Sequence, residues 1–339
     1  MDNIVISVIM PTLNSARTIE ESLKSIRNQH FDQGKVEILI IDAGSTDETI
    51  NIANKYDCTI LQNERKLPEF AKQIGFEKAR GEWAIFIDSD EMFTNMDSFS
   101  ERIILLNKYP KIKNLVSTGM RCKQGEIGIN RYANRIADPF SWFVYRFNGY
   151  DRMKSMKKAF HHKQVGNAEV FSFKKSDYIP LYDALGNTFH LETARYIYEK
   201  ENRPDNFVAN IFENMAVETG YVAILYDDYV VHDPGLTEKI YKSKMIWRIK
   251  NNLFNDEGVG FSGRLKRKGY LTKRKYLYIL YSVTLIPVLL DGISLSIENK
   301  DIYMMKHIFW NEFVFFNIIF YVLLKMLHVP VKKLEKYGK

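Results

Sequence analysis

The chain has 339 residues, of which 48 are Lys or Arg and 41 are Asp or Glu, so its formal net charge is +7. That length allows one large α/β domain with an additional region, while the two cysteines, Cys58 and Cys122, are too few for a disulfide scaffold or a structural zinc site and favour a reducing compartment. The charge excess alone fits nucleic acid, anionic lipid or a phosphate-bearing substrate, so the positions of the charges must decide between them. The N-terminus has no basic stretch leading into an apolar core and a cleavage site, and we expect no secretory signal there.

The N-terminal part of the chain alternates between strand and helix patterns. Runs of β-branched and other apolar residues predict short strands at residues 4–10, 36–41, 59–61 and 83–87. Apolar residues at helical spacing predict the intervening helices, at residues 18–29, 47–56 and 68–79. This order predicts an α/β fold in which parallel strands are joined by right-handed crossovers.

The pattern weakens between residues 95 and 183, where aromatic residues alternate with Arg and Lys. We expect this segment to continue the sheet and to supply substrate loops. A helix is predicted at 205–219, with Gly220 in the position of a C-cap. A last strand is predicted at 221–231, ending at His232.

The C-terminal part has a different composition. Residues 264–275 are rich in Lys and Arg, and two apolar stretches follow at 276–297 and 308–329, each long enough to cross a bilayer. Both stretches are interrupted by residues unusual in a membrane span, namely Pro287, Asp291, Asn311, Glu312, Asn317 and Lys325. The basic outer flanks would keep both ends of a spanning hairpin in the cytoplasm, but they also suit helices that lie in the membrane interface. A buried helical subdomain is the alternative to membrane attachment.

The expected organisation therefore has three parts. Residues 1–235 form a catalytic domain, residues 236–275 form a basic helical linker, and residues 276–339 form membrane-associated or transmembrane helices. This arrangement predicts a protein of the cell membrane whose catalytic domain lies on the cytoplasmic face.

Two carboxylates follow the predicted strand at 83–87. Asp88 and Asp90, separated by Ser89, leave the carboxyl end of this strand, where open α/β sheets bind ligands. Side by side, they can share a divalent cation that also binds phosphate oxygens. A solvated acidic turn would have the same sequence, so this motif needs support from others.

A second motif follows the predicted strand at 36–41. Gly44 permits a tight turn, and Ser45 or Thr46 can cap the following helix. Asp42 is expected to point into the same crevice as Asp88. An ordinary strand-turn-helix connection explains the capping residue well but explains Asp42 less well.

Taken in order, these segments resemble the family 2 glycosyltransferases. The motifs that carry the resemblance are Pro11-Thr12-Leu13-Asn14, Asp42-Ala43-Gly44-Ser45-Thr46-Asp47, Ala79-Arg80-Gly81-Glu82-Trp83 and Asp88-Ser89-Asp90-Glu91. The resemblance covers residues 4–95 closely and residues 180–235 loosely.

The resemblance implies a GT-A fold and an inverting transfer from a nucleotide-diphosphate sugar, with a UDP-sugar favoured over a GDP-sugar and Mg²⁺ or Mn²⁺ as the cofactor. It implies a donor pocket formed by Pro11, Thr12, Asn14, Asp42 and Asp88. Metal binding falls to Asp88, Asp90 and His232, although a His at a strand end is also often structural. Lys72 is expected either to add positive charge near the diphosphate or to be a solvated helical lysine.

An inverting transfer also needs a carboxylate that accepts the proton of the attacking hydroxyl. The family places this base in a Glu-Asp pair at the start of a helix. This chain departs from that pattern, because Pro204 occupies the position of the first acid. Asp205 is therefore our first choice, with Glu213 and Glu192 as alternatives, and Asp205 could equally be a helix N-cap.

The expected acceptor is a lipid-linked molecule or a glycan at a membrane, and the C-terminal helices are expected to contact membrane lipids. A polyprenyl-phosphate monosaccharide synthase is the alternative within the family. A nucleotidyltransferase would carry a Gly-rich phosphate loop after its first strand, which this chain lacks. A basic membrane-bound scaffold or RNA-binding protein would leave Asp42, Asp88 and Asp90 without a role, so we expect no nucleic acid partner.

Overall fold

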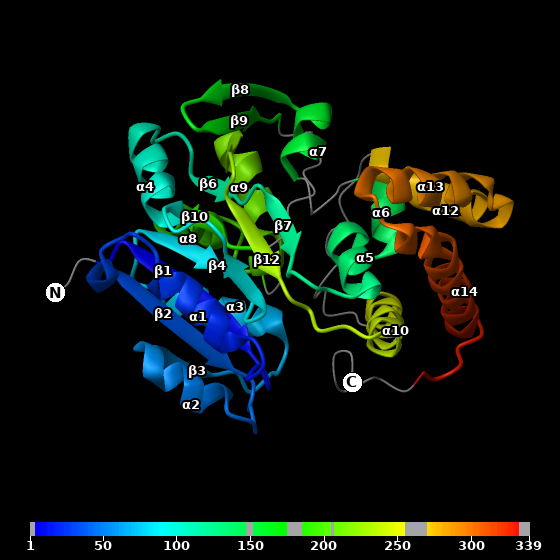
Figure 1. The fold of residues 1–339 in the computed structure, drawn as a ribbon, viewed down its shortest axis with the longest axis horizontal. Helices are drawn as coiled ribbons and strands as arrows, with labels where there is room; N and C mark the ends of the chain where they lie inside the picture. The colour runs from blue at the N-terminus through cyan, green and yellow to red at the C-terminus, as the bar shows by residue number, and fades with distance from the viewer. Residues whose placement is uncertain (1–3, 147–151, 175–184, 205–206, 255–269, 332–339) are drawn as a thin grey trace. The chain divides into compact units, whose positions relative to one another are not determined.

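The computed structural model describes residues 4–146, 152–174, 185–204, 207–254 and 270–331 (Figure 1). The chain forms two compact units. The first contains residues 1–123 and 150–233, and the second contains residues 124–149 and 234–339. The segment 124–149, which we expected within a catalytic domain of residues 1–235, thus belongs with the C-terminal helices.

The first unit is built on a nine-stranded sheet in the order β3-β2-β1-β4-β10-β6-β11-β9-β8. The four predicted N-terminal strands are present and mutually parallel, as β1 (Ile6–Thr12), β2 (Val36–Asp42), β3 (Thr59–Gln62) and β4 (Trp83–Phe86). The residues of β2 are all buried, as expected for a central strand between helical layers. The carboxyl ends of β1, β2 and β4 consequently meet at one edge of the sheet.

The predicted crossover helices are also present, as α1 (Ile19–Arg27), α2 (Thr49–Ala53) and α3 (Pro68–Lys78). Ile19, Leu23 and Ile26 form the buried face of α1, which explains their helical spacing. The second helix is shorter than the predicted 47–56, because its α-helical part ends at Ala53 and a 3₁₀ turn follows.

Beyond β4 the sheet becomes mixed, because β10 (Asn187–His190) runs antiparallel to β4. As expected, residues 95–183 add strands to the sheet. The elements added in this half are α4 (Ser98–Lys108), β6 (Asn114–Val116), α7 (Arg152–Ala159), β8 (His161–Val165), β9 (Ala168–Ser172), α8 (Leu191–Lys200), α9 (Ile211–Thr219) and β11 (Tyr221–Leu225).

Two predicted boundaries near residue 220 are wrong. The expected single strand at 221–231 is two strands, β11 and β12 (Tyr229–His232), because the chain turns between them with Asp227 at a φ of 59°. Strand β12 belongs to a separate sheet, between β5 (Glu91–Phe93) and β7 (Gly119–Cys122).

The helix expected from residue 205 is also shorter, since a 3₁₀ turn at Val208–Asn210 precedes α9. Its predicted C-cap is confirmed. Gly220 has a φ of 78°, and its N–H donates to the carbonyl of Ala216 at 2.8 Å.

The second unit is helical and has its own core. Its helices are α5 (Gly128–Ile136), α6 (Pro139–Tyr145), α10 (Glu238–Phe254), α12 (Tyr270–Thr284), α13 (Ile286–Asn299) and α14 (His307–Met326). Tyr132, Tyr241 and Trp310 come from different helices and pack together in this core. Phe140, Trp142 and Phe143, which we expected in substrate loops, instead lie on α6, where packing against α12 and α14 buries Phe143 and partly buries the other two.

The two apolar C-terminal stretches have different structures. The stretch predicted at 276–297 is broken at Leu285, and its two parts are bent by 90°. The second stretch forms α14. By length and hydropathy, the helical segment Ile302–Met326 could cross a membrane, and the bent pair could form a second span, although core helices of soluble proteins can meet the same criteria.

Candidate active site

Three loops meet at the carboxyl edge of β1, β2 and β4. The backbone N–H of Asn14 donates to Ser45 Oγ at 2.8 Å, and the side-chain oxygen of Asn14 accepts from the N–H of Thr46 at 2.8 Å. Ser89 Oγ donates to Ser15 Oγ at 2.8 Å, which ties the third loop to the first. The motifs that are far apart in sequence therefore form one hydrogen-bonded group.

Asp42 organises the second of these loops. Its buried carboxylate accepts from Thr12 Oγ1 at 3.0 Å and from the N–H groups of Gly44 and Ser45 at 2.9 and 2.8 Å. Gly44 has a φ of 91°, which a residue with a Cβ rarely adopts. Pro11 is the residue before the end of β1 and is paired in register with Ile41. Asp42 and Thr12 thus hold the shape of the predicted donor-binding edge.

Lys72 is buried on α3, and its Nζ lies 3.3 Å from Asp88 Oδ1. The alternative of a solvated helical lysine is therefore wrong. The helix can approach the sheet because residue 75 is glycine, where a Cβ would lie 2.3 Å from a side-chain carbon of Ile9. Close packing of α3 thereby brings a cation to the partly exposed Asp88.

Asp90 and His232 lie next to each other at one end of the three-stranded sheet. Strand β12 places His232 opposite Glu91 of β5, and His232 Nε2 lies 3.5 Å from Asp90 Oδ2. Burial lowers the pKa of His232, but the charge of Asp90 and its hydrogen bond outweigh this, so the pKa lies above its ordinary value. Asp90 and His232 are both only partly exposed.

Glu91 is a functional candidate whose role the sequence did not reveal. It is buried, and its Oε2 accepts from the N–H groups of Asp88 and Leu185, both at 2.9 Å. Burial and the charge of Asp88 raise the pKa of Glu91 to about 8. Glu91 therefore fixes the turn that carries Asp88 and Asp90. Its position directly after the Asp-x-Asp motif was the sequence feature from which this role could have been predicted.

Two further cations lie near this edge and were also not predicted. Arg17 Nη1 lies 2.8 Å and Lys123 Nζ lies 3.5 Å from the Asp233 carboxylate, next to His232 in the chain. Burial raises the pKa of Asp233, but Arg17 and Lys123 outweigh that effect and hold the pKa below its ordinary value. The backbone N–H of Asp233 donates to the carbonyl of Asp90 at 2.8 Å, which connects this cluster to the Asp-x-Asp turn.

The side chains of Asp90 and His232 are suitable ligands for a divalent cation that substrate would also bind. Asp90 Oδ2 and His232 Nε2 are 3.5 Å apart, a separation that two ligands of one cation with bonds of about 2.1 Å can have. Among the residues that the structure describes, no group of three or more His, Cys, Asp or Glu side chains forms a complete metal cluster. Mg²⁺ commonly takes one or two protein carboxylates and completes its coordination with substrate phosphates and water.

The candidates for the base lie in different places. Asp205 is outside the described residues. Glu213 is buried in the first turn of α9. Glu192 begins α8 after β10, and β10 ends opposite Trp83, the first residue of β4. Glu192 is thus about 10 Å or more from the Asp88 end of β4, the length of a four-residue strand, and is wrong as a base for this site.

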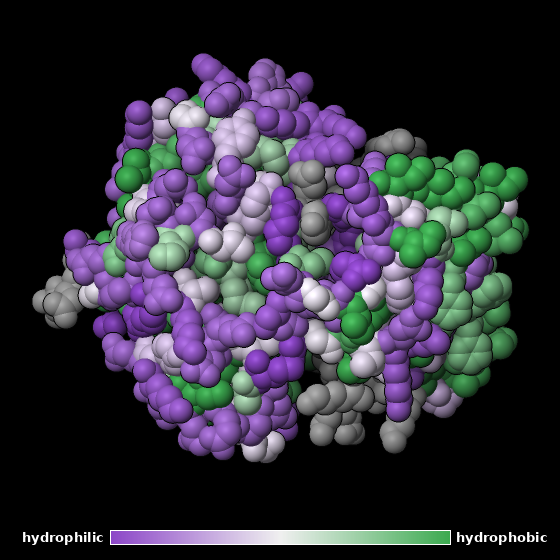
Figure 2. Space-filling model, in the orientation of Figure 1, coloured by the Kyte–Doolittle hydropathy of each residue, from purple (hydrophilic) through white to green (hydrophobic). Residues whose placement is uncertain are grey.

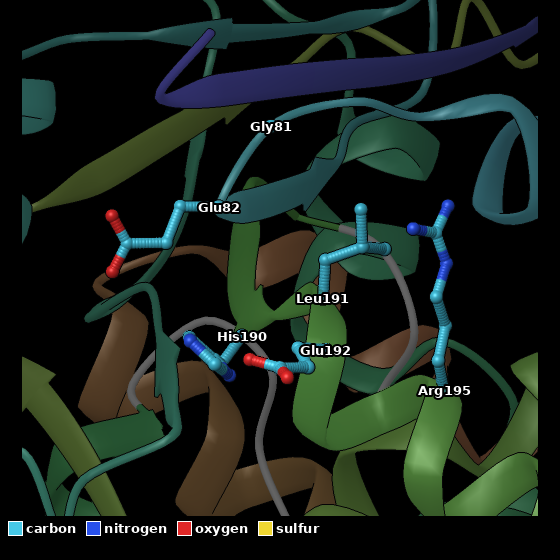
Figure 3. Close-up of a pocket in the computed structure, with 6 residues that line it drawn as sticks. All are labelled: Gly81, Glu82, His190, Leu191, Glu192 and Arg195. Carbon is cyan, nitrogen blue, oxygen red and sulfur yellow. The ribbon is translucent and has the colours of Figure 1, made fainter. Parts of the chain in front are cut away.

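Figure 3 shows the small open pocket that contains Glu192, together with Glu82, His190 and Arg195. It lies at the amino end of β4, because Gly81 and Glu82 precede that strand. Ligands of open α/β sheets bind at the carboxyl ends of the strands. The pocket is therefore on the wrong edge of the sheet for the predicted donor site.

The mixed sheet, its parallel N-terminal half and the Asp-x-Asp turn after β4 define a GT-A-like fold. Residues 7–163, a little under half of the chain, match the family model described as Glycosyl transferase family 2.

The similar proteins are themselves glycosyltransferases. The poly(ribitol-phosphate) beta-N-acetylglucosaminyltransferase TarS of Staphylococcus aureus is 29% identical over 109 residues, which are 30% of this chain and 19% of TarS. The GalNAc(5)-diNAcBac-PP-undecaprenol beta-1,3-glucosyltransferase of Campylobacter jejuni is 32% identical over 93 residues, which are 25% of this chain and 29% of that protein. The matches thus cover less than a third of either relative.

A solved structure extends the fold comparison over nearly the whole chain. It is the mannosyltransferase PcManGT from Pyrobaculum calidifontis in complex with GDP-Man and Mn²⁺, with a TM-score of 0.56 and 15% identity. The alignment covers 97% of this chain and 88% of that one. At this identity the likeness establishes a shared fold and does not transfer a substrate.

Proposed function

We propose that this protein is an inverting glycosyltransferase that moves a monosaccharide from a nucleotide-diphosphate sugar to a lipid-linked or glycan acceptor. The observation that carries the proposal is the grouping of Asp88, Asp90, His232 and Lys72 at the carboxyl edge of a GT-A-like sheet. A diphosphate needs positive charge around it as it leaves. Here a buried lysine and a candidate cation site provide that charge.

Asp90 and His232 would hold Mg²⁺ or Mn²⁺, with Asp88 beside them. When bound, such a cation acts as a Lewis acid that neutralises charge on the leaving diphosphate. Lys72 and Glu91 orient Asp88 through the ion pair and the backbone hydrogen bond described above. Pro11, Thr12, Asn14 and Asp42 belong to the adjoining loops, where we place the nucleoside of a UDP-sugar or, as a second choice, a GDP-sugar.

The acceptor hydroxyl must lose a proton as it attacks the anomeric carbon. We place this task on Asp205, with Glu213 as the alternative. The carboxylate accepts the hydroxyl proton, the acceptor oxygen bonds to the anomeric carbon, and the bond from that carbon to the diphosphate breaks. The outcome is inversion at the anomeric carbon.

We also propose that the enzyme works at the cytoplasmic face of the cell membrane, with the second unit in contact with lipids. The exposed apolar residues of α12, α13 and α14 support this location. A lipid-linked acceptor is consistent with it, since the Campylobacter relative is named for an undecaprenol-linked acceptor.

The test is a thermal-shift series with UDP, GDP, CDP and their common sugars, each with and without Mn²⁺. A ligand that binds only the folded state raises the melting temperature according to its occupancy. We expect one nucleotide to stabilise the protein only with metal, and Asp90→Ala to remove that dependence. A folded sample that no nucleotide stabilises would contradict the proposal.

A further inference from the structure

The second unit exposes a large apolar surface. Leu280, Ile286 and Leu290 on α12 and α13 are each at least 60% exposed. Figure 2 shows apolar side chains gathered over α12, α13 and α14. No charged residue occurs between Tyr276 and Leu290. Monomeric soluble proteins rarely expose apolar patches of this kind, so this surface, called the apolar face below, calls for a partner.

From His307 to Leu323, helix α14 exposes only one of its sides. Phe309, Phe316, Phe320, Leu323 and Leu327 are exposed and follow each other at spacings of three, four or seven residues, which places them on one side of the helix. The opposite side is buried within the unit, at residues that include His307, Trp310, Asn311 and Val314. The helix is therefore apolar toward the surface and packed against protein behind.

Helix α10 lies beside α14 over most of its length. Lys242 Nζ is 5.1 Å from the ring centroid of Phe309, and Lys250 Nζ is 5.2 Å from that of Tyr321. Near its C-terminal end, Lys325 Nζ donates to the carbonyl of Leu253. The two helices thus run side by side in the same direction.

Helix α10 cannot accompany α14 through a bilayer. It carries Glu238, Lys239, Lys242, Lys244, Arg248 and Lys250. Each Lys or Arg at the centre of a spanning helix costs about 2.5–3.5 kcal/mol. If α14 crossed the bilayer, α10 would have to enter the bilayer beside it with these charges. The apolar composition of α14 is therefore not sufficient evidence that it spans the membrane.

The bend between α12 and α13 is held by a polar group. Leu285 has a φ of 58° at the break. Across it, Tyr281 Oη donates to Asp291 Oδ2 at 2.6 Å, and Arg146 Nη1 lies 2.8 Å from the same oxygen. Straightening the pair into one span would separate Tyr281 from Asp291.

We infer that the second unit lies in the plane of the membrane, with its apolar face in the acyl region of one leaflet and without a spanning helix. The partner is an anionic bilayer. Lys275 directly precedes the apolar part of α12, Lys300 is at the end of α13, and Lys306, whose Nζ is 2.6 Å from Glu238, is at the start of α14. Headgroup phosphates would lie at these positions. The inference rests on the membrane location proposed above and specifies its geometry.

The test measures depth along α14 in the full-length protein bound to vesicles of equal parts phosphatidylethanolamine and phosphatidylglycerol. Single cysteines at Phe309, Phe316, Leu323 and Leu327, in a background without Cys58 and Cys122, carry nitroxide labels. We expect all four labels at similar depths, about 5–10 Å below the headgroups. A spanning helix would instead spread them over about 27 Å, at 1.5 Å per residue, and that result would overturn the inference.

Matched lysine substitutions complete the test. Leu290→Lys on the apolar face should weaken vesicle binding about tenfold or more, whereas Ile104→Lys, at an exposed site on α4, should not. Absence of vesicle binding by the unsubstituted protein would also overturn the inference. This includes the case in which sedimentation shows that the protein self-associates instead of binding vesicles. Donor-dependent turnover in detergent is measured separately, so failure of the membrane geometry is distinguishable from failure of the enzymatic proposal.

Discussion

The carboxyl edge of the first unit and the apolar face of the second are built in opposite ways. At the edge, buried polar groups have close partners, as Asp42 has Thr12 and Lys72 has Asp88. On the apolar face, large side chains such as Ile286 are exposed to the surroundings. A site whose polar groups are already paired is preorganised for chemistry, whereas an exposed apolar surface gains its free energy only when something covers it.

Among the substitutions that test this comparison, Asp90→Ala at the carboxyl edge is expected to have the largest effect. It removes the carboxylate that faces His232, and a cation site contributes several kcal/mol to transfer, so metal-dependent turnover should fall by about 1,000-fold or more. Turnover is measured with the donor identified by thermal shift, alongside the melting temperature.

The matched control is Asp227→Asn, on the exposed turn between β11 and β12, where asparagine tolerates the positive φ of 59°. This variant should keep full turnover. Unchanged turnover in Asp90→Ala would remove the metal-site assignment, and loss of folding in that variant would show that Asp90 has a structural role.

The next effect concerns the base. Asp205→Asn should leave the donor dissociation constant unchanged and lower kcat about 100- to 10,000-fold, the usual contribution of general base catalysis. Glu213→Gln is the comparison, since Glu213 is buried in α9. Single-turnover kinetics with saturating donor separates the two, and the reverse result would assign the base to Glu213.

A smaller effect is expected from Lys72→Met, which keeps the buried volume but removes the charge beside Asp88. Donor affinity should fall about 10- to 100-fold, because a hydrogen bond to a charged group contributes about 1.5–3 kcal/mol. The melting temperature should stay similar, since an apolar side chain packs well at a buried site. Lys78→Met, exposed at the end of the same helix, is the control, and equal donor affinity in all three proteins would show that Lys72 serves packing alone.

Much of the first unit could be predicted because its signals are local. The run Val36 to Ile41 is apolar throughout since it is buried on both sides, and Asp42 follows directly at the strand end. The parallel half of the sheet and the position of Asp88 and Asp90 follow from such runs.

Other features depend on contacts between distant segments, which periodicity does not reveal. The sequence from Tyr221 to His232 is apolar in both β11 and β12, and Asp227 and Asp228 mark the turn between them. The pairing of β12 with β5 and β7 in a second sheet, however, depends on residues far away in the chain. Lys72 looked like a surface lysine because its partner, Asp88, is on a different element. The apolar runs of the second unit indicated a membrane, but the charged helix beside α14 could not be placed from sequence.

The smallest effect tests whether paired charges also stabilise the second unit. Asp301 accepts from Arg131 Nε at 2.6 Å and Nη2 at 3.1 Å, and these bonds hold the pKa of Asp301 below its ordinary value, although burial acts in the opposite direction. Asp301→Asn should lower the free energy of unfolding by about 1–2 kcal/mol at neutral pH.

The sign of the pH dependence follows from that lowered pKa. The stabilisation is fully present above the unfolded-state pKa of Asp, about 3.9, and is lost as the pH falls through the lower folded-state pKa. Denaturant unfolding, followed by helical circular dichroism, should therefore show a gap between the unsubstituted and variant proteins that narrows below about pH 4. Glu298→Gln, an exposed charge removal on α13, should produce no gap at either pH. A gap of the same size at low pH would mean that the geometry of Asp301, and not its charge, supports the helical unit.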